Sequence, residues 1–259
     1  GTCTFYGTAN SNQMLMEIMG LQLPGSSFIN PDDPSREIFT ESAVSQSLAI
    51  TSDGDNYRPV GRIVDEAAIV NAIVGLMATG GSTNHTIHLV AIAAAAGITI
   101  DWNDFADLSK AVPLLASVYP NGQSDINHFE AAGGLAVIIS ELMDAGLLNE
   151  EVETVVGSGL YHYGKAVQVR EGRIVWSDSR PNSSDRSVLR GVTDPFSPEG
   201  GIRLVEGNIG RAIVKVSAVA VEHQVVSAPA RVFSSQDEFA EAFEAGELAE
   251  DLVAVVTGQ

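Results

Sequence analysis

The chain has 259 residues, of which 45% are hydrophobic and 18% are charged, a globular composition that excludes a disordered or fibrous protein. Its formal net charge of −19 would repel nucleic acid and anionic membranes, so we expect neither as a partner. No apolar stretch is long enough to span a bilayer and no signal peptide is recognisable, so we expect a cytoplasmic protein. Because the chain begins with Gly1 and stops in an apolar run, we also expect an internal fragment of a longer protein.

Helices are predicted over much of the first 180 residues. Residues 9–19 and 35–50 favour helices that are bounded by glycine or turn-rich segments. Apolar side chains recur at helical spacing in three further segments, at residues 65–78, 84–96 and 135–142. Short β-prone pieces at 98–100 and 154–156 lie between or after these helices. This alternation predicts an α/β fold, with a layered α/β domain over residues 1–180.

The character of the sequence changes after about Ser179. A polar, turn-rich stretch at 181–184 is typical of a linker. Short β-prone segments follow it, at residues 202–205, 212–216 and 225–233. A helix interrupts them, and Ser235 and Glu238 have the spacing of a capping box at its start. We therefore predict that residues 181–259 hold a linker and the incomplete start of a mostly β, barrel-like second domain.

The single cysteine, Cys3, lies in a Gly- and Thr-rich turn directly before a predicted helix. Positive partial charge at a helix start favours a thiolate, and a thiolate is the form that binds a metal or an iron–sulfur cluster. A small residue that packs beneath a turn has the same pattern. The residues by themselves leave both roles open.

A second glycine-rich helix start reads ATGGSTNH at residues 78–85. Its backbone N–H groups and the hydroxyls of Ser82 and Thr83 suit a carboxylate or a phosphate, although an ordinary helix cap has the same pattern. His85 and His88 have a spacing that a metal could use, but a pair is short of a metal site.

A third polar cluster precedes another glycine-containing helix start and comprises Asp125, His128 and Glu130. One interpretation is an active-site loop that supplies a hydrogen bond or a proton. The other is a helix cap that carries a surface histidine. The local pattern without other information favours the helix cap.

Five segments taken together resemble one known family. They are GTCTFYGTANSNQM at 1–14, LQLPGSS at 21–27, ATGGSTNHTIHLVAIA at 78–93, YPNGQSDINHFEAAGG at 119–134 and EGNIGRAIVKVSAV at 206–219. In order and wording they resemble the dihydroxy-acid and 6-phosphogluconate dehydratase family. FYG at 5–7 and NHT at 84–86 are closer to the 6-phosphogluconate branch, since the branched-chain enzymes tend to read Gly-Met-Tyr and Asn-Ala-Val there.

The resemblance implies a homodimeric hydro-lyase with a [4Fe–4S] cluster held by three cysteines. Cys3 matches the last of these ligands, and the other two, with the family's general-base serine, would lie outside this chain. The chain would then be inactive alone, and no catalytic residue is assigned within it. A divalent cation such as Mg²⁺ is a further candidate cofactor. The candidate substrate-binding residues are Ser82, Thr83, Asn84 and His128.

The implied reaction removes water from 6-phospho-D-gluconate and gives 2-dehydro-3-deoxy-6-phospho-D-gluconate, a step of the Entner–Doudoroff pathway. The expected partner is therefore a small anionic sugar acid. Two alternatives stay open. One is a sister dehydratase that acts on dihydroxyisovalerate or another aldonic acid, and the other is a cluster-free relative that only binds a sugar acid or a partner.

Overall fold

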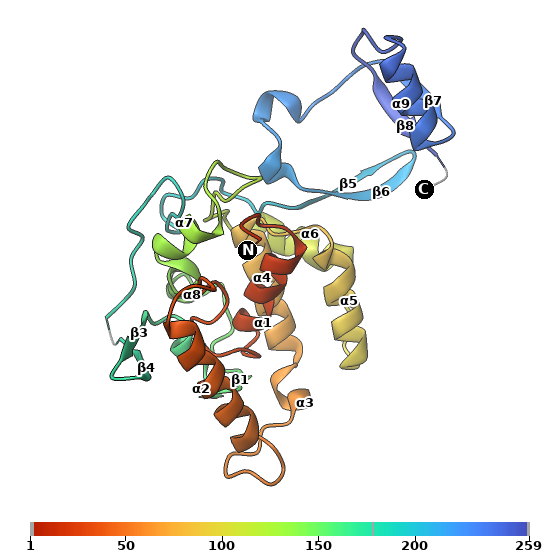
Figure 1. Cartoon of the computed structure of the whole chain (residues 1–259). Helices are drawn as coiled ribbons and strands as arrows, with labels where there is room; N and C mark the ends of the chain where they lie inside the picture. Colours follow the sequence, from red (N-terminus) through yellow and green to blue (C-terminus); the bar gives the residue numbers. More distant parts are fainter. Residues whose placement is uncertain (1–2, 178, 258–259) are drawn as a thin grey trace. The chain divides into compact units, whose positions relative to one another are not determined.

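The computed structural model describes residues 3–177 and 179–257 (Figure 1). It divides into two compact units, Gly1–Ala218 and Val219–Gln259. None of the described helices is both long and apolar enough to cross a membrane.

Helices form the core of the first unit. They are α1 (Thr8–Ile18), α2 (Ser35–Ala49), α3 (Val60–Ile63), α4 (Glu66–Thr79), α5 (His85–Ala95), α6 (Trp102–Ala111), α7 (Ile126–Ala131) and α8 (Gly134–Asp144). The five helices predicted in this unit, three of them from apolar periodicity, are confirmed with ends within two residues of those expected. Helices α3, α6 and α7 were not predicted, and α6 begins with a capping box between Asp101 and Asp104.

Helix α4 is the centre of this unit and packs against α1, α5, α6 and α8. It is buried almost throughout because its sequence is apolar on nearly every side. The Asp65 carboxylate caps it by accepting a hydrogen bond from Ala68 N at 2.8 Å. Figure 1 shows α1 running beside α4. Gly75 permits this approach, since a Cβ at that position would lie 2.8 Å from Ile18 Cδ1.

The strands pair two by two. Antiparallel hairpins join β1 (Glu153–Thr154) to β2 (Gly157–Ser158), β3 (Val167–Arg170) to β4 (Arg173–Trp176), and β5 (Arg203–Gly207) to β6 (Gly210–Val214). Short 3₁₀ turns are η1 (Leu160–His162), η2 (Val216–Ala218) and η3 (Val221–His223). The mixed α/β class is confirmed, and the strands of the described residues form no closed barrel.

Two local strand predictions are wrong. Residues 98–100 form no strand, because Ile98 and Ile100 pack against the core without a pairing partner. At 154–156 only Thr154 is in a strand, and Val155 and Val156 make the turn of the β1–β2 hairpin. In both places the apolar side chains serve packing, which β-propensity cannot distinguish from pairing.

The boundary at residue 180 was predicted between the two domains of the complete protein, and it stays a prediction. In the described structure Val188, Leu189 and Ile202 belong to the core of the first unit. The segment that contains Val188 also lies against the first unit, because Ser117 N donates to the Val188 carbonyl at 2.9 Å.

The second unit contains β7 (Ala230–Phe233), α9 (Gln236–Glu244) and β8 (Val253–Val256). The two strands are parallel, and the helix provides the crossover that a parallel pair requires. Ser235 caps α9 by accepting from Glu238 N at 3.1 Å, which is one half of the predicted capping box; the Glu238 carboxylate accepts from Ser234 N at 2.6 Å instead. Phe239 packs edge-on against Phe233, with ring centroids 5.2 Å apart, whereas Phe243 is 68% exposed.

Candidate functional site

The first turn of α1 and the start of α5 lie against each other. Thr8 Oγ1 accepts from Asn84 Nδ2 at 2.7 Å and lies 2.9 Å from Ser82 Oγ. The Ser11 hydroxyl accepts from Ser82 N at 3.2 Å. Hydrogen bonds of side chains thus join the motif at residues 1–14 to the motif at residues 78–85. We call this group the α1–α5 polar cluster; it consists of Thr8, Ser11, Ser82, Asn84 and His85.

Two glycines, Gly80 and Gly81, form the turn between α4 and α5 and thereby place the start of α5 beside α1. Gly80 ends α4 in a left-handed conformation with φ +59°, and Gly81 N donates to the Leu76 carbonyl at 3.2 Å. A Cβ on Gly80 would lie 2.5 Å from Asn121 Nδ2, which itself donates to the Gly80 carbonyl at 2.9 Å. Only glycine combines this backbone conformation with this close approach.

The three substrate-binding candidates at the start of α5 are reachable from solvent, since Ser82 and Thr83 are half-buried and Asn84 is exposed. Ser82 Oγ accepts from Asn84 N at 3.2 Å, which is a local helix-start bond. The Asn84 side chain makes no cap to its own helix and donates to Thr8 instead. The hydroxyl and amide groups of this start can therefore also serve a ligand that approaches it.

His85 is fully buried beneath the same helix start. Its Nε2 lies 3.0 Å from Ser11 Oγ and 3.2 Å from the Thr8 carbonyl. Burial lowers the pKa of His85 to about 4, so the ring is neutral at neutral pH. His88 is exposed, with its ring centroid 5.6 Å from that of His85. Across the described residues no three His, Cys, Asp or Glu side chains gather as metal ligands, so this pair does not extend into a metal site.

Cys3 presents an exposed thiol just before α1. Among the described residues the thiol is exposed and is not packed beneath the turn. The backbone around it is held in place, because Asn10 Nδ2 donates to the carbonyls of both Cys3 and Phe5 at 2.8 Å. The thiol is thus accessible on a segment that the first turn of α1 secures.

His128 lies at the start of α7, on the exposed side of a helix cap. Asp125 caps this helix by accepting from the backbone N–H groups of Asn127 and His128, both at 3.0 Å. His128 Nδ1 lies 2.7 Å from the Asp125 carboxylate, and its side chain is 67% exposed. A helix cap is therefore confirmed here, although the capped helix is the short α7 and not the glycine-opened α8. Ile126 N also donates to the Thr4 carbonyl at 3.0 Å, which ties this cap to the Cys3 segment.

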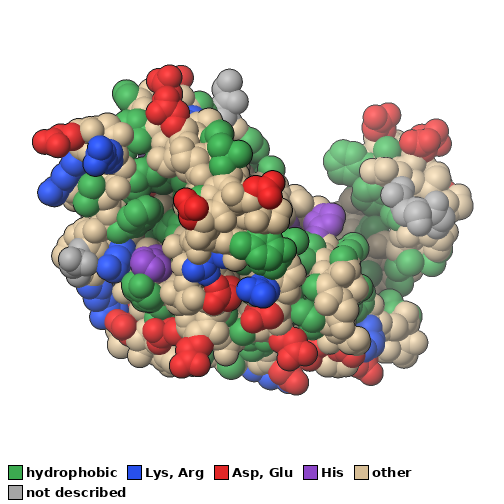
Figure 2. Space-filling model, turned by 90° about the horizontal axis from the view of Figure 1, so that it is seen from below, with side chains coloured by type: hydrophobic (Ala, Val, Ile, Leu, Met, Phe, Trp, Pro, Cys, Tyr) green, Lys and Arg blue, Asp and Glu red, His purple; other side chains and the backbone are tan. Residues whose placement is uncertain are grey.

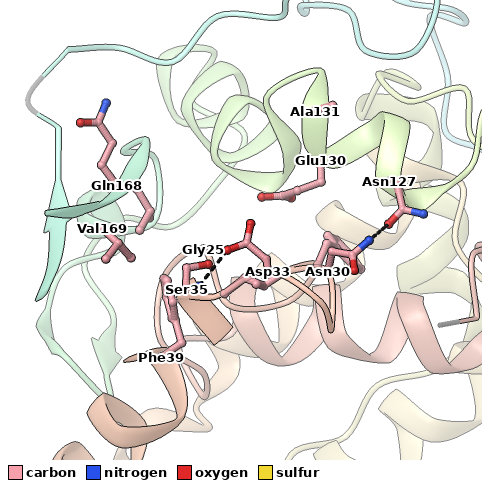
Figure 3. A pocket seen from close by; sticks show the side chains of 13 residues that line it. Gly25, Asn30, Asp33, Ser35, Phe39, Asn127, Glu130, Ala131, Gln168 and Val169 are labelled. Atoms are coloured by element: carbon pink, nitrogen blue, oxygen red, sulfur yellow. Dashed lines mark hydrogen bonds between the residues drawn. The ribbon is translucent and has the colours of Figure 1, made fainter. Parts of the chain in front are cut away.

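A cavity of about 600 Å³ lies between the loop after α1, the start of α2, α7 and β3. Figure 3 shows the carboxylates of Asp33 and Glu130 pointing toward each other across it. Asn30 Nδ2 donates to Asn127 Oδ1 at 3.4 Å on one side, and Ser35 N donates to Asp33 at 2.8 Å on the other (Figure 3). Of the two carboxylates, the sequence analysis identified only Glu130.

A third carboxyl group, Glu17 of α1, lies beneath the cavity region and lines a smaller pocket together with Glu130. Glu17 is fully buried and accepts from Gly25 N at 2.7 Å and Ser27 N at 2.9 Å. Burial raises the pKa of Glu17. Sequence reasoning missed this residue, and the available signal is its position three residues after Met14, on the apolar face of the helix.

Replacing Glu130 by Gln is expected to stabilise the complete protein at pH 8 and to change it little at pH 5. Burial, followed by the charge of Glu17, raises the pKa of Glu130 from 4.5 to about 7. The folded state therefore disfavours the ionised carboxylate, and stability falls as pH rises from about 4.5 through about 7. Water reaches this side chain, so we expect a gain of only about 1 kcal/mol at pH 8.

The measurement is the thermal midpoint of Glu130→Gln and of its parent at both pH values. Glu41→Gln, which removes an exposed carboxylate of α2, serves as the matched control. A gain of equal size at pH 5 and pH 8 would contradict the ionisation argument.

Family models match most of this chain. Residues 1–163 match the model described as dihydroxy-acid/6-phosphogluconate dehydratase N-terminal, and residues 187–259 match the corresponding C-terminal model.

Curated relatives are similar over the whole chain. It is 57% identical to a phosphogluconate dehydratase of Pseudomonas aeruginosa and 54% identical to one of Escherichia coli strain K12, in both cases over 100% of the chain. It is 36% identical, over 99% of its length, to a dihydroxy-acid dehydratase of Caldanaerobacter subterraneus. In each case the chain spans 43% of the relative's own length.

Proposed function

The chain belongs to the dihydroxy-acid/6-phosphogluconate dehydratase family, and we propose that it is part of a phosphogluconate dehydratase. The observation that supports this proposal most is the identity of 57% and 54% with relatives of that name, against 36% with a dihydroxy-acid dehydratase. The reaction proposed for the complete protein converts 6-phosphogluconate to a 2-keto-3-deoxy acid. The hydroxyl leaves C3, a base removes the proton from C2, and the resulting enol becomes the ketone.

We propose Cys3 as one ligand of a [4Fe–4S] cluster. An exposed thiol on the segment that precedes a helix fits one such ligand. It is the only cysteine of the chain, so the remaining cysteine ligands must come from elsewhere in the complete protein. When bound, such a cluster supplies a Lewis-acidic iron for the departing hydroxyl group. A bound Mg²⁺ ion and a homodimer stay predictions.

The start of α5 is proposed to bind an anionic end of the substrate through Ser82, Thr83 and Asn84. The chain carries 33 acidic and 14 basic side chains, and Figure 2 shows acidic groups spread over the face that it displays. An anion in this field needs donors that are close and already oriented, which a helix start provides. His128 is a second candidate contact, because its cap is tied to the Cys3 segment.

Replacing Ser82 and Thr83 together by Ala in the complete enzyme is expected to lower kcat/KM for 6-phosphogluconate by about 10- to 100-fold. Each hydroxyl that bonds a charged group contributes roughly 1.5 kcal/mol, and about 1.4 kcal/mol corresponds to a factor of ten. The measurement is steady-state kinetics, with Ser45→Ala on α2 as a control for the loss of an exposed hydroxyl. Kinetics equal to those of the parent would exclude this part of the proposal.

The test of the function is 2-keto acid formation by the complete, anaerobically reconstituted protein. 6-Phosphogluconate and dihydroxyisovalerate are compared in the same assay. Preference for the phosphorylated acid supports the proposal, and preference for dihydroxyisovalerate assigns the protein to the sister activity. Iron and sulfide analysis separates both from a cluster-free binding protein, because an intact cluster requires about four of each per chain.

A further inference from the structure

His85 is a buried polar residue to which the proposed function gives no role. It is 0% exposed, and it lies directly beneath the helix start that is proposed to bind substrate. Its ring forms its hydrogen bonds with α1, through Ser11 Oγ at 3.0 Å and the Thr8 carbonyl at 3.2 Å. Burying an imidazole costs free energy unless its polar atoms find partners, so the partners indicate what the residue does.

The hydrogen-bond partners determine which ring nitrogen carries the proton. The Thr8 carbonyl can only accept. Ser11 uses its own proton to donate to the Gly7 carbonyl at 2.7 Å, so toward His85 it also accepts. Nε2 must therefore be the protonated nitrogen. Nδ1 is buried without a hydrogen-bond partner among the described residues and carries the lone pair of the neutral ring.

The two groups that accept from His85 belong to the first turn of α1, and that turn holds Cys3. Asn10 lies between Thr8 and Ser11 and donates from Nδ2 to the Cys3 carbonyl at 2.8 Å. His85 and Cys3 are thus linked through one turn of helix α1. His85 bonds to Thr8 and Ser11, and Asn10, which lies between them in the sequence, bonds to the Cys3 carbonyl. The same turn bonds Asn84 through Thr8 Oγ1 at 2.7 Å.

We propose that His85 is a positioning residue whose Nε2–H fixes the Cys3 segment relative to the helix start at Ser82–Asn84. This inference rests on the proposed function in one respect, namely that these two segments serve the same reaction. The side chain touches neither segment's reactive groups and acts through the first turn of α1. Loss of the donor would leave both segments present but misaligned. A misplacement of about 1 Å between reacting groups costs up to about a hundredfold in rate.

Three replacements of His85 in the complete protein separate the donor from the bulk of the ring. Gln places an amide N–H near the position of Nε2, Asn places it near the position of Nδ1, and Leu keeps the volume without a donor. The matched control is His88→Gln, on the same helix but exposed. The readouts are kcat and KM separately, iron content, and deuterium uptake of residues 3–12 in the apo-protein.

The expected result is that His85→Gln and the His88 control stay within about threefold of the parent, whereas the Asn and Leu variants lose about 10- to 100-fold. The loss lies in kcat, with KM within about threefold, because the anion-binding groups of α5 are retained. Deuterium uptake of residues 3–12 becomes faster in the Asn and Leu variants only.

Two outcomes would overturn the proposal. One is parent-like kinetics and exchange in the Asn and Leu variants, and the other is equal damage in all three variants with a retained fold. If the Leu variant does not fold, the contrast between Gln and Asn decides. If the parent itself does not act on 6-phosphogluconate, the proposed function fails, and the order of deuterium uptake among the variants still tests the positioning role by itself.

Discussion

Replacing Cys3 by Ser in the complete protein is expected to lower kcat/KM for 6-phosphogluconate by about a thousandfold or more, together with a loss of bound iron. A serine hydroxyl stays protonated at neutral pH and is a poor ligand for the iron that a soft thiolate binds. A metal that stabilises the departing oxygen contributes several kcal/mol, and about 4 kcal/mol corresponds to a factor of a thousand. Because the thiol is exposed and, among the described residues, makes only a long contact of 3.9 Å to the Phe5 carbonyl, the fold should not depend on it.

The measurement combines anaerobic kinetics with iron and sulfide analysis of the purified variant. Thr4→Ala is the matched control, since Thr4 is the exposed neighbour and its backbone carbonyl bond to Ile126 N is kept. The Thr4 variant should retain both iron and activity. A Cys3→Ser protein with full iron content and an unchanged rate would remove Cys3 from the cluster and with it the central part of the proposal.

Replacing Gly80 by Ala is expected to destabilise the protein by about 2–5 kcal/mol and to weaken substrate binding. The left-handed conformation at φ +59° costs a residue with a Cβ about 1–2 kcal/mol. The added Cβ would also meet Asn121 Nδ2 at 2.5 Å and Ser217 Oγ at 2.9 Å, and overpacking of this kind costs about 1–3 kcal/mol. Relief of the clash must move the turn that leads to Ser82, so KM should rise as well.

Gly97→Ala separates these two causes. Gly97 also has a left-handed backbone, with φ +78°, but a Cβ there meets nothing within 4 Å. Its replacement should therefore show only the conformational cost, with unchanged KM. Thermal midpoints of the two complete variant proteins, with kinetics under the same conditions, test the difference. Equal destabilisation by both replacements would show that the contacts around Gly80 adjust at no cost.

The helical part of the fold could be predicted because it is encoded locally. In α4, apolar side chains repeat with the helical period, Asp65 caps the start, and a glycine ends the helix. Strands were harder to predict, because the sequence of an isolated β-prone segment does not show which other segment it pairs with. Residues 98–100 show this, since Ile98 and Ile100 are partly buried against the core without any strand pairing.

The sequence by itself determined the candidate groups of the site: a thiol before a helix at Cys3, and a glycine-rich helix start at Ser82–Asn84. Both follow from short-range rules of capping, backbone conformation and ligand chemistry. Only the tertiary structure decided that these motifs meet, through a contact between Thr8 and Ser82, which are 74 positions apart. It also decided that His85 is buried while His88, three residues later, is exposed. Helical periodicity predicts that one face of α5 is covered. Which side chains of α1 cover it depends on packing between segments distant in the sequence, and no local pattern encodes that packing.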